Sequence, residues 1–429
     1  MATELHERLA ELADVTPPGS PPGDLWDRGV RRRRVVAASR VAVALVFFLL
    51  VGLGGWTWHA SRPIEPADPQ GEPHLPDRFY VPSPWVRSLE SPSGALVAIG
   101  TAVRKSLLHT QLAVYGVTAS SGQYGFLDLE DAASFDGRDP ALSPTGRYVA
   151  YWLRSRPSDS SNADGVGGVG VYDGVTGQTR FYRQASPHGL APWTLAWVGA
   201  SDLVIDFDRW RTGGAGGAAD TPSALRWSMG SPSPRPLSAS VTEHVDPSAG
   251  ITSSGNGTWL VAPFLVDKAD RVVRISGVGT PYGAEVSPGR HWLAALHGRG
   301  SPSRVAVHVL VSKGRNRIHA TPVRLLPTQQ KYLSLLGWVD EDHLAGEAAA
   351  PGATFRRLVV ALDVRTGETT TLVRPGSLPI LATGFLDAPI VPASPPPHPL
   401  DRRWLAGGTL LCVAVVVLYL VGAARVRRA

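Results

Sequence analysis

Two apolar segments near opposite ends of the chain constrain its fold most strongly. Residues 41–58 (VAVALVFFLLVGLGGWTW) and 404–424 (WLAGGTLLCVAVVVLYLVGAA) contain 18 and 21 consecutive residues without a charged side chain. About 20 apolar residues in a helix are enough to cross the hydrocarbon core of a bilayer. Both segments therefore predict transmembrane helices, which would place both termini on one side of a membrane and the intervening chain on the other.

The charges that flank these segments predict their orientation. Arginines cluster before the first span and after the second, at positions 31–34 and 40 and at positions 425, 427 and 428. An excess of Lys and Arg beside a span marks the cytoplasmic side of a membrane. We therefore expect a cytoplasmic tail over residues 1–40, a cytoplasmic end over residues 425–429, and an extracytoplasmic region between the spans. The scarcity of lysine, 4 residues against 38 arginines, suggests a GC-rich, bacterial genome.

Other interpretations of these end segments stay open. The first span could be the core of a cleaved signal peptide, although the following WTWHAS offers no small-x-small cleavage site. The second span could be a buried core helix. The tail could be a disordered segment whose arginines only set the orientation, or a docking peptide for a cytoplasmic partner, with its apolar residues at Leu5, Leu9, Leu12 and Trp26.

The charge and cysteine content argue against two classes of function for the middle of the chain. Of the 42 basic and 36 acidic residues, 32 and 30 lie outside residues 1–40 and 404–429, so this region is close to neutral. A nucleic-acid partner, which requires a basic stripe, is not supported. The single cysteine, Cys412, lies in the second span and allows neither an intramolecular disulfide nor a thiolate metal site.

Proline-rich spacers separate the spans from a central domain. Residues 59–77 and 390–403 have the composition of extended, semi-rigid linkers. Between them, residues 78–389 are long enough for one large or two small domains. The 46 glycines and 37 prolines of the chain favour many turns over long helices.

Four segments of this domain share one frame. Each starts with Ser, has a bulky residue five positions later and an apolar residue after that: SPSGALVAI from Ser91, SPTGRYVAY from Ser143, SGNGTWLVA from Ser254 and SPGRHWLAA from Ser287. Three copies have Gly three positions after the Ser, and the fourth has Arg290. Because Ser and Pro favour turns and Gly tolerates positive φ, the frame predicts a tight turn that leads into a buried strand. WVGASDLVI from Trp197 and WVDEDHLAG from Trp338 are variant copies.

A second signature predicts β-hairpins. VYDGVTGQTRFY (171–182) and ALDVRTGETTTLV (361–373) both place Asp-x-x-Thr-Gly between two β-rich arms. Residues 112–129 are a looser version of the same pattern. Turn residues between strand-forming arms are typical of a hairpin.

The spacing of the repeats predicts the fold class. Repeats start near residues 91, 143, 197, 254, 287 and 338, and self-similarity at about 40–50 residues is typical of a propeller. We therefore predict an all-β fold, a β-propeller of about six blades with seven possible, flanked by two transmembrane α-helices. Strands near 380–391 or residues 78–87 would close the ring, and residues 159–170 and 213–220 would be insertions between strands. The alternative is a pair of packed β-sandwiches.

The repeat frame also resembles a known family. The Ser-Pro-x-Gly entry and the Asp-x-x-Thr-Gly hairpins are similar to the WD-like propeller repeats of TolB-type proteins, over about residues 80–389. The usual Asp of the SPDG frame is replaced by Ser93 and Thr145, and the fourth copy lacks the Gly. The resemblance implies a propeller fold and says little about function.

No motif assigns a catalytic residue, a cofactor or a metal ion, and we predict none of the three. GVGGVG (165–170) lacks the spacing of a dinucleotide-binding loop and indicates a flexible loop. The acidic segments DFD (206–208) and DED (340–342) could bind Ca²⁺, but isolated acidic turns are commoner. His291 and His297 have a spacing that suits no ligand pair. A Ser–His–Asp triad built from distant residues stays possible, without a Gly-x-Ser-x-Gly elbow to support it.

These observations together favour a binding protein over an enzyme. We expect a non-enzymatic, two-pass protein of the bacterial cell membrane whose extracytoplasmic propeller binds a protein or cell-envelope ligand. One alternative is an envelope sensor that relays a signal to a cytoplasmic regulator through the N-terminal tail. Another is a propeller hydrolase.

Overall fold

The computed structural model describes most of the central region of the chain. Residues 71–135, 138–156, 165–210 and 223–237 are described without interruption, and residues 252–399 with short gaps, together with the single positions 7, 29, 30, 33, 408 and 417. Apart from those positions, the tail and both predicted spans lie outside the described residues. Within the described part of the chain, no helix is both long and apolar enough to cross a membrane. The chain divides into two compact units, residues 63–399 and the two ends together.

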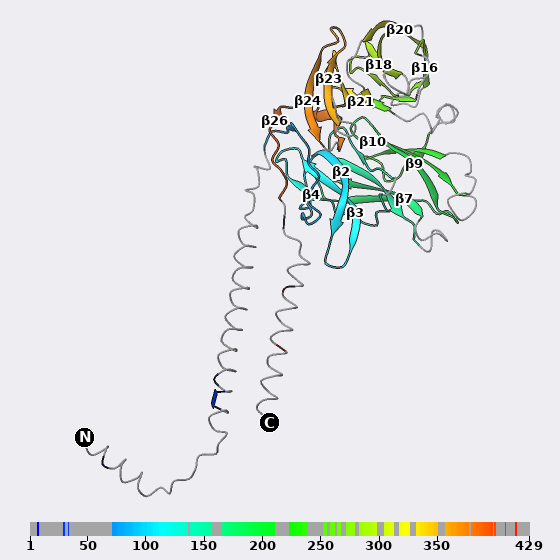
Figure 1. The fold of residues 1–429 in the computed structure, drawn as a ribbon. Coiled ribbons are helices and arrows are strands. Elements are labelled where there is room, and N and C mark those ends of the chain that lie inside the picture. Colours follow the sequence, from blue (N-terminus) through cyan, green and yellow to red (C-terminus); the bar gives the residue numbers. More distant parts are fainter. Residues whose placement is uncertain are drawn as a thin grey trace. The chain divides into compact units, whose positions relative to one another are not determined.

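The described residues of the unit 63–399 form β-strands that divide into six groups of four, antiparallel within each group. Figure 1 shows these strands coloured along the sequence. The first group is β25 (Ile380–Leu381), β2 (Leu96–Lys105), β3 (Thr110–Thr118) and β4 (Tyr124–Phe126). The second is β5 (Ala141–Leu142), β6 (Tyr148–Arg154), β7 (Val166–Asp173) and β8 (Thr179–Arg183), and the third is β9 (Leu190–Val198), β10 (Asp202–Arg209), β11 (Ser223–Ser228) and β12 (Arg235–Pro236).

The remaining three groups follow in chain order. The fourth is β13 (Thr252–Ser254), β14 (Thr258–Val261), β15 (Phe264–Val266) and β16 (Val272–Ser276). The fifth is β17 (Gly283–Val286), β18 (Trp292–His297), β19 (Arg304–Ser312) and β20 (Arg317–Leu326). The sixth is β21 (Tyr332–Trp338), β22 (His343–Ala349), β23 (Arg357–Asp363) and β24 (Thr369–Gly376). Each of the six predicted repeat starts leads into the second strand of one group.

A strand near the C-terminal end of the domain, β25, completes the first group. In the antiparallel pairing of β25 with β2, Leu381 lies opposite Ala98 and Ile380 opposite Ile99. Of the two segments predicted to close the ring, strands near 380–391 or residues 78–87, the former supplies the strand that completes the first group, at Ile380–Leu381. A second terminal pairing joins β1 (Leu75–Pro76) and β26 (Ile390–Val391), which run parallel.

Apolar packing links each group to the next. In β6, Tyr151 packs in a buried cluster shared with the first group, whereas Trp152 packs in a cluster shared with the third. In β23, Val360 packs towards the fifth group and Val359 towards the first. Two further clusters join the third group to the fourth and the fourth to the fifth. The described part of residues 63–399 is therefore all-β, and each sheet buries both faces against different neighbours, as in a propeller and unlike two packed sandwiches.

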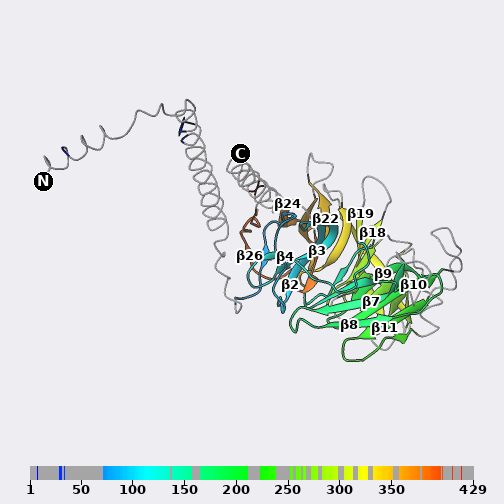
Figure 2. The same cartoon turned by 90° about the horizontal axis from the view of Figure 1, so that it is seen from below.

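Two pairings depart from fully separate groups. β16 and β20 pair in parallel at Arg274 and Arg317, and β7 meets β9 at Val166 and Leu190. These contacts merge the second group with the third and the fourth with the fifth into two eight-stranded sheets. Seen from below, the strands of the first three groups still follow one another in colour order (Figure 2).

The Ser of the repeat frame holds the turn before the second strand. Ser143 Oγ accepts a hydrogen bond from Tyr148 N at 2.9 Å, and Ser287 Oγ accepts one from Trp292 N at 3.1 Å. Gly146 has φ +69° in this turn. Arg290, at the equivalent position of the fourth copy, has φ +60°, so the turn keeps its left-handed residue without glycine.

The Asp-x-x-Thr-Gly segments form the predicted hairpins. Asp173 Oδ1 accepts a hydrogen bond from Val175 N in the turn between β7 and β8. Asp363 accepts one from Arg365 N at 2.7 Å in the turn between β23 and β24. The side chain of the first residue therefore satisfies turn amides that no strand partner can reach.

These repeated turns lie at one end of the sheets, which we call the turn face. Strands reverse direction along each group, so the first-to-second and third-to-fourth connections share one end and the second-to-third connections share the other. Contacts between groups confirm the alignment, because Leu96 N bonds Gly146 O and Gly94 N bonds Gly174 O. The opposite end, where residues 106–109 join β2 to β3 and where β6 and β10 end at Arg154 and Arg209, is called the loop face.

One predicted insertion is partly wrong. Residues 159–164 lie outside the described residues, but Val166–Gly170 belong to the buried strand β7 and do not form a flexible loop. The glycines are required by packing, since a Cβ on Gly170 would lie 2.5 Å from the ring of Tyr151 on β6. Residues 213–220 lie between β10 and β11 but outside the described residues.

Substitutions at the left-handed turn position test the role of the repeat frame. A Cβ at Gly146 would collide with the carbonyl oxygen of Leu96, so Gly146→Ala should lower the free energy of unfolding by about 2–4 kcal/mol. Arg290→Gly removes left-handed strain and should raise it by about 0.5 kcal/mol. Thermal unfolding of the full-length chain measures both, and Arg290→Ala, which keeps the strain, is the matched control. Equal stabilities for Arg290→Gly and Arg290→Ala would contradict this account.

Candidate functional site

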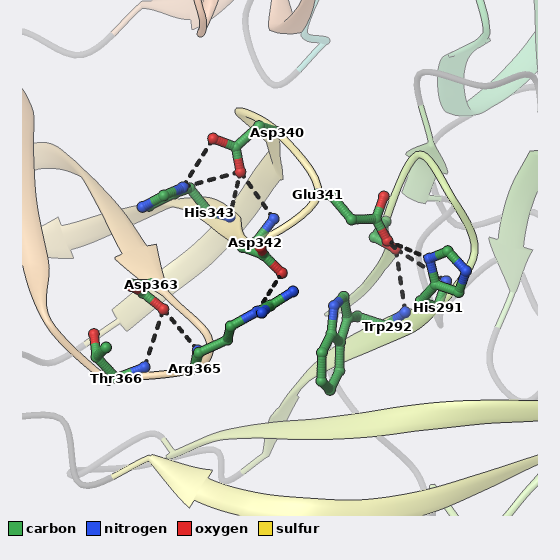
Figure 3. Close-up of polar contacts among 10 residues, drawn as sticks. His291, Trp292, Asp340, Glu341, Asp342, His343, Asp363, Arg365 and Thr366 are labelled. Carbon is green, nitrogen blue, oxygen red and sulfur yellow. Dashed lines mark hydrogen bonds and ion pairs between the residues drawn. The ribbon is translucent and has the colours of Figure 1, made fainter.

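On the turn face of the fifth and sixth groups, several polar side chains form hydrogen bonds that hold turns together (Figure 3). Glu341, in the turn between β21 and β22, accepts hydrogen bonds from Ser287 Oγ and Gly289 N, each at 2.7 Å. His291 Nδ1 lies 3.0 Å from the same carboxylate. Although burial acts to raise it, these hydrogen bonds lower the pKa of Glu341. The carboxylate therefore ties the fifth group to the sixth.

This cluster combines Ser, His and Glu but lacks the geometry of a hydrolytic triad. A triad requires the nucleophilic hydroxyl to bond the imidazole, which in turn bonds the acid. Here Ser287 Oγ donates directly to Glu341, and the Ser287 side chain is fully buried. Ser287 is a turn residue, and the arrangement gives it no route to activate a substrate.

The three carboxylates of DED (340–342) point to different partners. Asp340 bonds the ring and backbone of His343, and Asp342 accepts a hydrogen bond from Arg365 Nε at 2.8 Å. Glu341 bonds the neighbouring group, so the three do not converge on one point (Figure 3). A Ca²⁺ ion needs six to eight converging oxygen ligands. The described geometry of DED does not fit a calcium site.

The carboxylates of DFD (206–208) behave differently. Asp206 and Asp208 lie near the loop-face end of β10, on the same side of the strand, and both are buried. Phe207 points to the other side, into the core shared with the second group. Both oxygens of Asp206 and Oδ1 of Asp208 have no hydrogen-bond partner among the described residues. We call these two residues the Asp pair.

A β-bulge places an indole beside the Asp pair. Thr194 lies opposite Asp206 and Pro192 opposite Phe207, so the intervening Trp193 of β9 has no opposite residue. Its side chain is 54% exposed, and Nε1 donates a hydrogen bond to Asp208 Oδ2 at 2.7 Å. Bulges commonly re-aim a side chain near a functional site. The sequence showed the two acids but not this indole, because the bulge depends on the register of β9 against β10.

The electrostatics of the Asp pair suit a positively charged group. Burial, and then the charge of Asp208, raises the pKa of Asp206 to about 6. Carboxylate oxygens with unused lone pairs accept strong hydrogen bonds from ammonium or guanidinium groups, and an indole face attracts cations. Among the described residues no three metal-ligating side chains gather, so the pair offers a cation only part of a coordination shell.

His291 and His297, whose spacing suits no ligand pair, have different neighbours. His291 belongs to the turn-face cluster, whereas His297 lies near His308 of β19, with ring centroids 6.5 Å apart. Burial lowers the pKa of His297 and of His308, and the nearby His297 lowers the pKa of His308 further. Sequence spacing could not reveal this pair, which forms across neighbouring strands.

Comparison with known proteins gives structural neighbours only. No family model matches the sequence, and no curated protein matches it. TolB from Acinetobacter baumannii overlays with a TM-score of 0.37 and 12% identity, covering 68% of this chain and 66% of TolB. An acylaminoacyl peptidase overlays with a TM-score of 0.39 and 10% identity, covering 64% of this chain and 44% of the peptidase.

An oligogalacturonate lyase from Vibrio parahaemolyticus is also similar, with a TM-score of 0.38 and 11% identity over 70% of this chain and 78% of the lyase. TolB proteins are thus among the structural neighbours. All of these TM-scores lie below 0.5, so the fold assignment rests on the strand pairing and the packing described above. These similarities assign no activity to this chain.

The raised pKa of Asp206 predicts a pH-dependent cost of folding. Below the unfolded pKa near 3.8 both states hold the proton, whereas between there and about 6 only the native state does. The contribution of Asp206 to stability should therefore fall as pH rises through this window, with a full cost on the order of 3 kcal/mol above it. Asp206→Asn should remove this contribution, so that the variant is more stable than the native sequence at pH 7.5 but not at pH 4. A difference in free energy of unfolding between the two proteins that is the same at every pH would contradict a raised pKa of Asp206.

Proposed function

We propose that this chain is a non-enzymatic integral membrane protein of a bacterial envelope, with both termini in the cytoplasm. Its extracytoplasmic propeller would bind a protein or cell-envelope ligand. The two uncharged segments 41–58 and 404–424 and the arginines beside them support the anchoring. The ring of six four-stranded groups supports the choice of a binding domain.

The Asp pair beside Trp193 carries the choice of surface. The carboxylates described on the turn face at Glu341, Asp342 and Asp363 have hydrogen-bond partners, whereas those of the Asp pair keep unused oxygens. Trp193 is exposed at the same place and presents an apolar surface that ends in a polar contact. Aromatic residues of this kind are enriched at the centres of protein interfaces. The proposed ligand therefore meets the loop face, with a cationic group directed to Asp208.

The two alternative functions have less support. A sensor that relays through the tail would share this outer domain, but residues 1–40 lie almost wholly outside the described residues. A hydrolase would need a nucleophile activated by a base, and the Ser287 cluster does not provide one.

Site-specific photo-crosslinking tests the proposed surface. A photoreactive residue in place of Trp193 should form an adduct with a ligand in intact membranes, because this side chain is exposed on the loop face. The same residue at Val175, which is exposed on the turn face, is the matched control and should form none.

A second substitution separates specific from incidental contact. Adding Asp208→Asn should reduce the adduct about tenfold, as expected for loss of a charge-assisted hydrogen bond. Equal adducts from both positions, or an adduct unaffected by Asp208→Asn, would contradict the proposed binding surface.

A further inference from the structure

The hairpin of β2 and β3 ends in an exposed apolar tip on the loop face. Figure 1 shows it projecting past the neighbouring strands. Leu108 is 85% exposed and Leu107 is 55% exposed, and Val103 and Leu112 are exposed below them. Scattered apolar residues are normal on a surface, but four along one projecting hairpin form a continuous apolar tip. A basic residue, Lys105, precedes the tip, and His109 follows it.

The C-terminal connection of the domain runs towards the same face. β26 is parallel to β1, and Ala393 N bonds Asp77 Oδ1 just beyond their pairing. The chain that continues from β1 reaches the base of the hairpin tip, where Pro84 O accepts a hydrogen bond from Lys105 N. The orange segment after β26 follows this direction in Figure 1, towards the end where the hairpin projects.

The connection between the domain and the second predicted span is short. Residues 392–403 separate β26 from Trp404, the first residue of that span. An extended chain rises at most about 3.5 Å per residue, so this connection can span at most about 45 Å. The loop face is the end towards which the described part of the connection runs.

We propose that Leu107 and Leu108 insert into the interfacial layer of the membrane that anchors the chain. This inference rests on the anchoring put forward under the proposed function. Transfer of apolar side chains from water to the acyl boundary of a membrane is favourable, and a neighbouring basic residue is attracted to anionic headgroups. The tip thus acts as a third membrane contact and holds the loop face at a fixed distance from the bilayer.

Fluorescence quenching in nanodiscs tests this contact on the full-length chain. Leu108→Cys in a Cys412→Ser background is labelled with an environment-sensitive nitrobenzoxadiazole probe. The protein is reconstituted in phosphatidylcholine–phosphatidylglycerol discs with and without doxyl-labelled lipid. Val175→Cys, at an exposed position on the turn face, is the matched control. We expect quenching at position 108 to exceed that at position 175 by about twofold or more, because only the tip enters the lipid.

The outcomes separate this inference from the anchoring on which it depends. Protein that co-elutes with discs but shows equal, weak quenching at both positions overturns the hairpin contact alone. A blue-shifted but unquenched probe at position 108 indicates a protein neighbour, such as a second copy, and also overturns it. Protein that fails to co-elute with discs overturns the anchoring itself. The tip is exposed, so the native melting temperature of Leu108→Cys excludes misfolding as a cause.

Discussion

Burial of both faces of every sheet is the constraint on which this structure depends. A four-stranded sheet with apolar residues on both sides cannot be stable in water alone, and each group here covers its neighbours' faces. The alternation within one strand shows this directly, since Tyr151 and Trp152 are adjacent in β6 yet lie in clusters shared with different groups. Such an arrangement is complete only if the last group also packs on the first. β25 supplies that closure by pairing with β2, and Val359 of β23 packs in the cluster of the first group.

The sequence predicted most of this fold because the turn chemistry repeats. Each repeat start marked the entry to a second strand, and the Ser hydroxyl of two copies bonds the amide five residues later. The fourth copy has Arg290 in place of glycine, and its backbone keeps a φ of +60°. The glycines of 165–170 gave a wrong prediction, because a strand in which Gly170 accommodates the ring of Tyr151 has the same composition as a flexible loop.

The candidate site was less accessible to prediction from sequence. DFD was recognisable as an acidic segment, but so was DED, and the two differ only in what lies around them. Asp342 is neutralised by Arg365, twenty-three residues away, whereas the Asp pair is left with unused oxygens beside Trp193. The distinction depends on strand register and on a bulge, and neither has a sequence signature here. The two faces of the domain consequently differ: repeated turns stabilise the turn face, whereas the buried Asp pair and the exposed Trp193 lie at the loop face.

Closure of the ring by β25 is tested most directly by hydrogen–deuterium exchange of the full-length chain carrying Leu381→Asp. Leu381 is buried and lies opposite Ala98, so the substitution should disrupt the pairing at the junction between the sixth and first groups. Because every group is covered by its neighbours, faster exchange should extend through β2–β4 and β21–β24, on both sides of the junction. Faster exchange confined to residues 379–386, with both flanking sheets as protected as in the native chain, would contradict a closed ring.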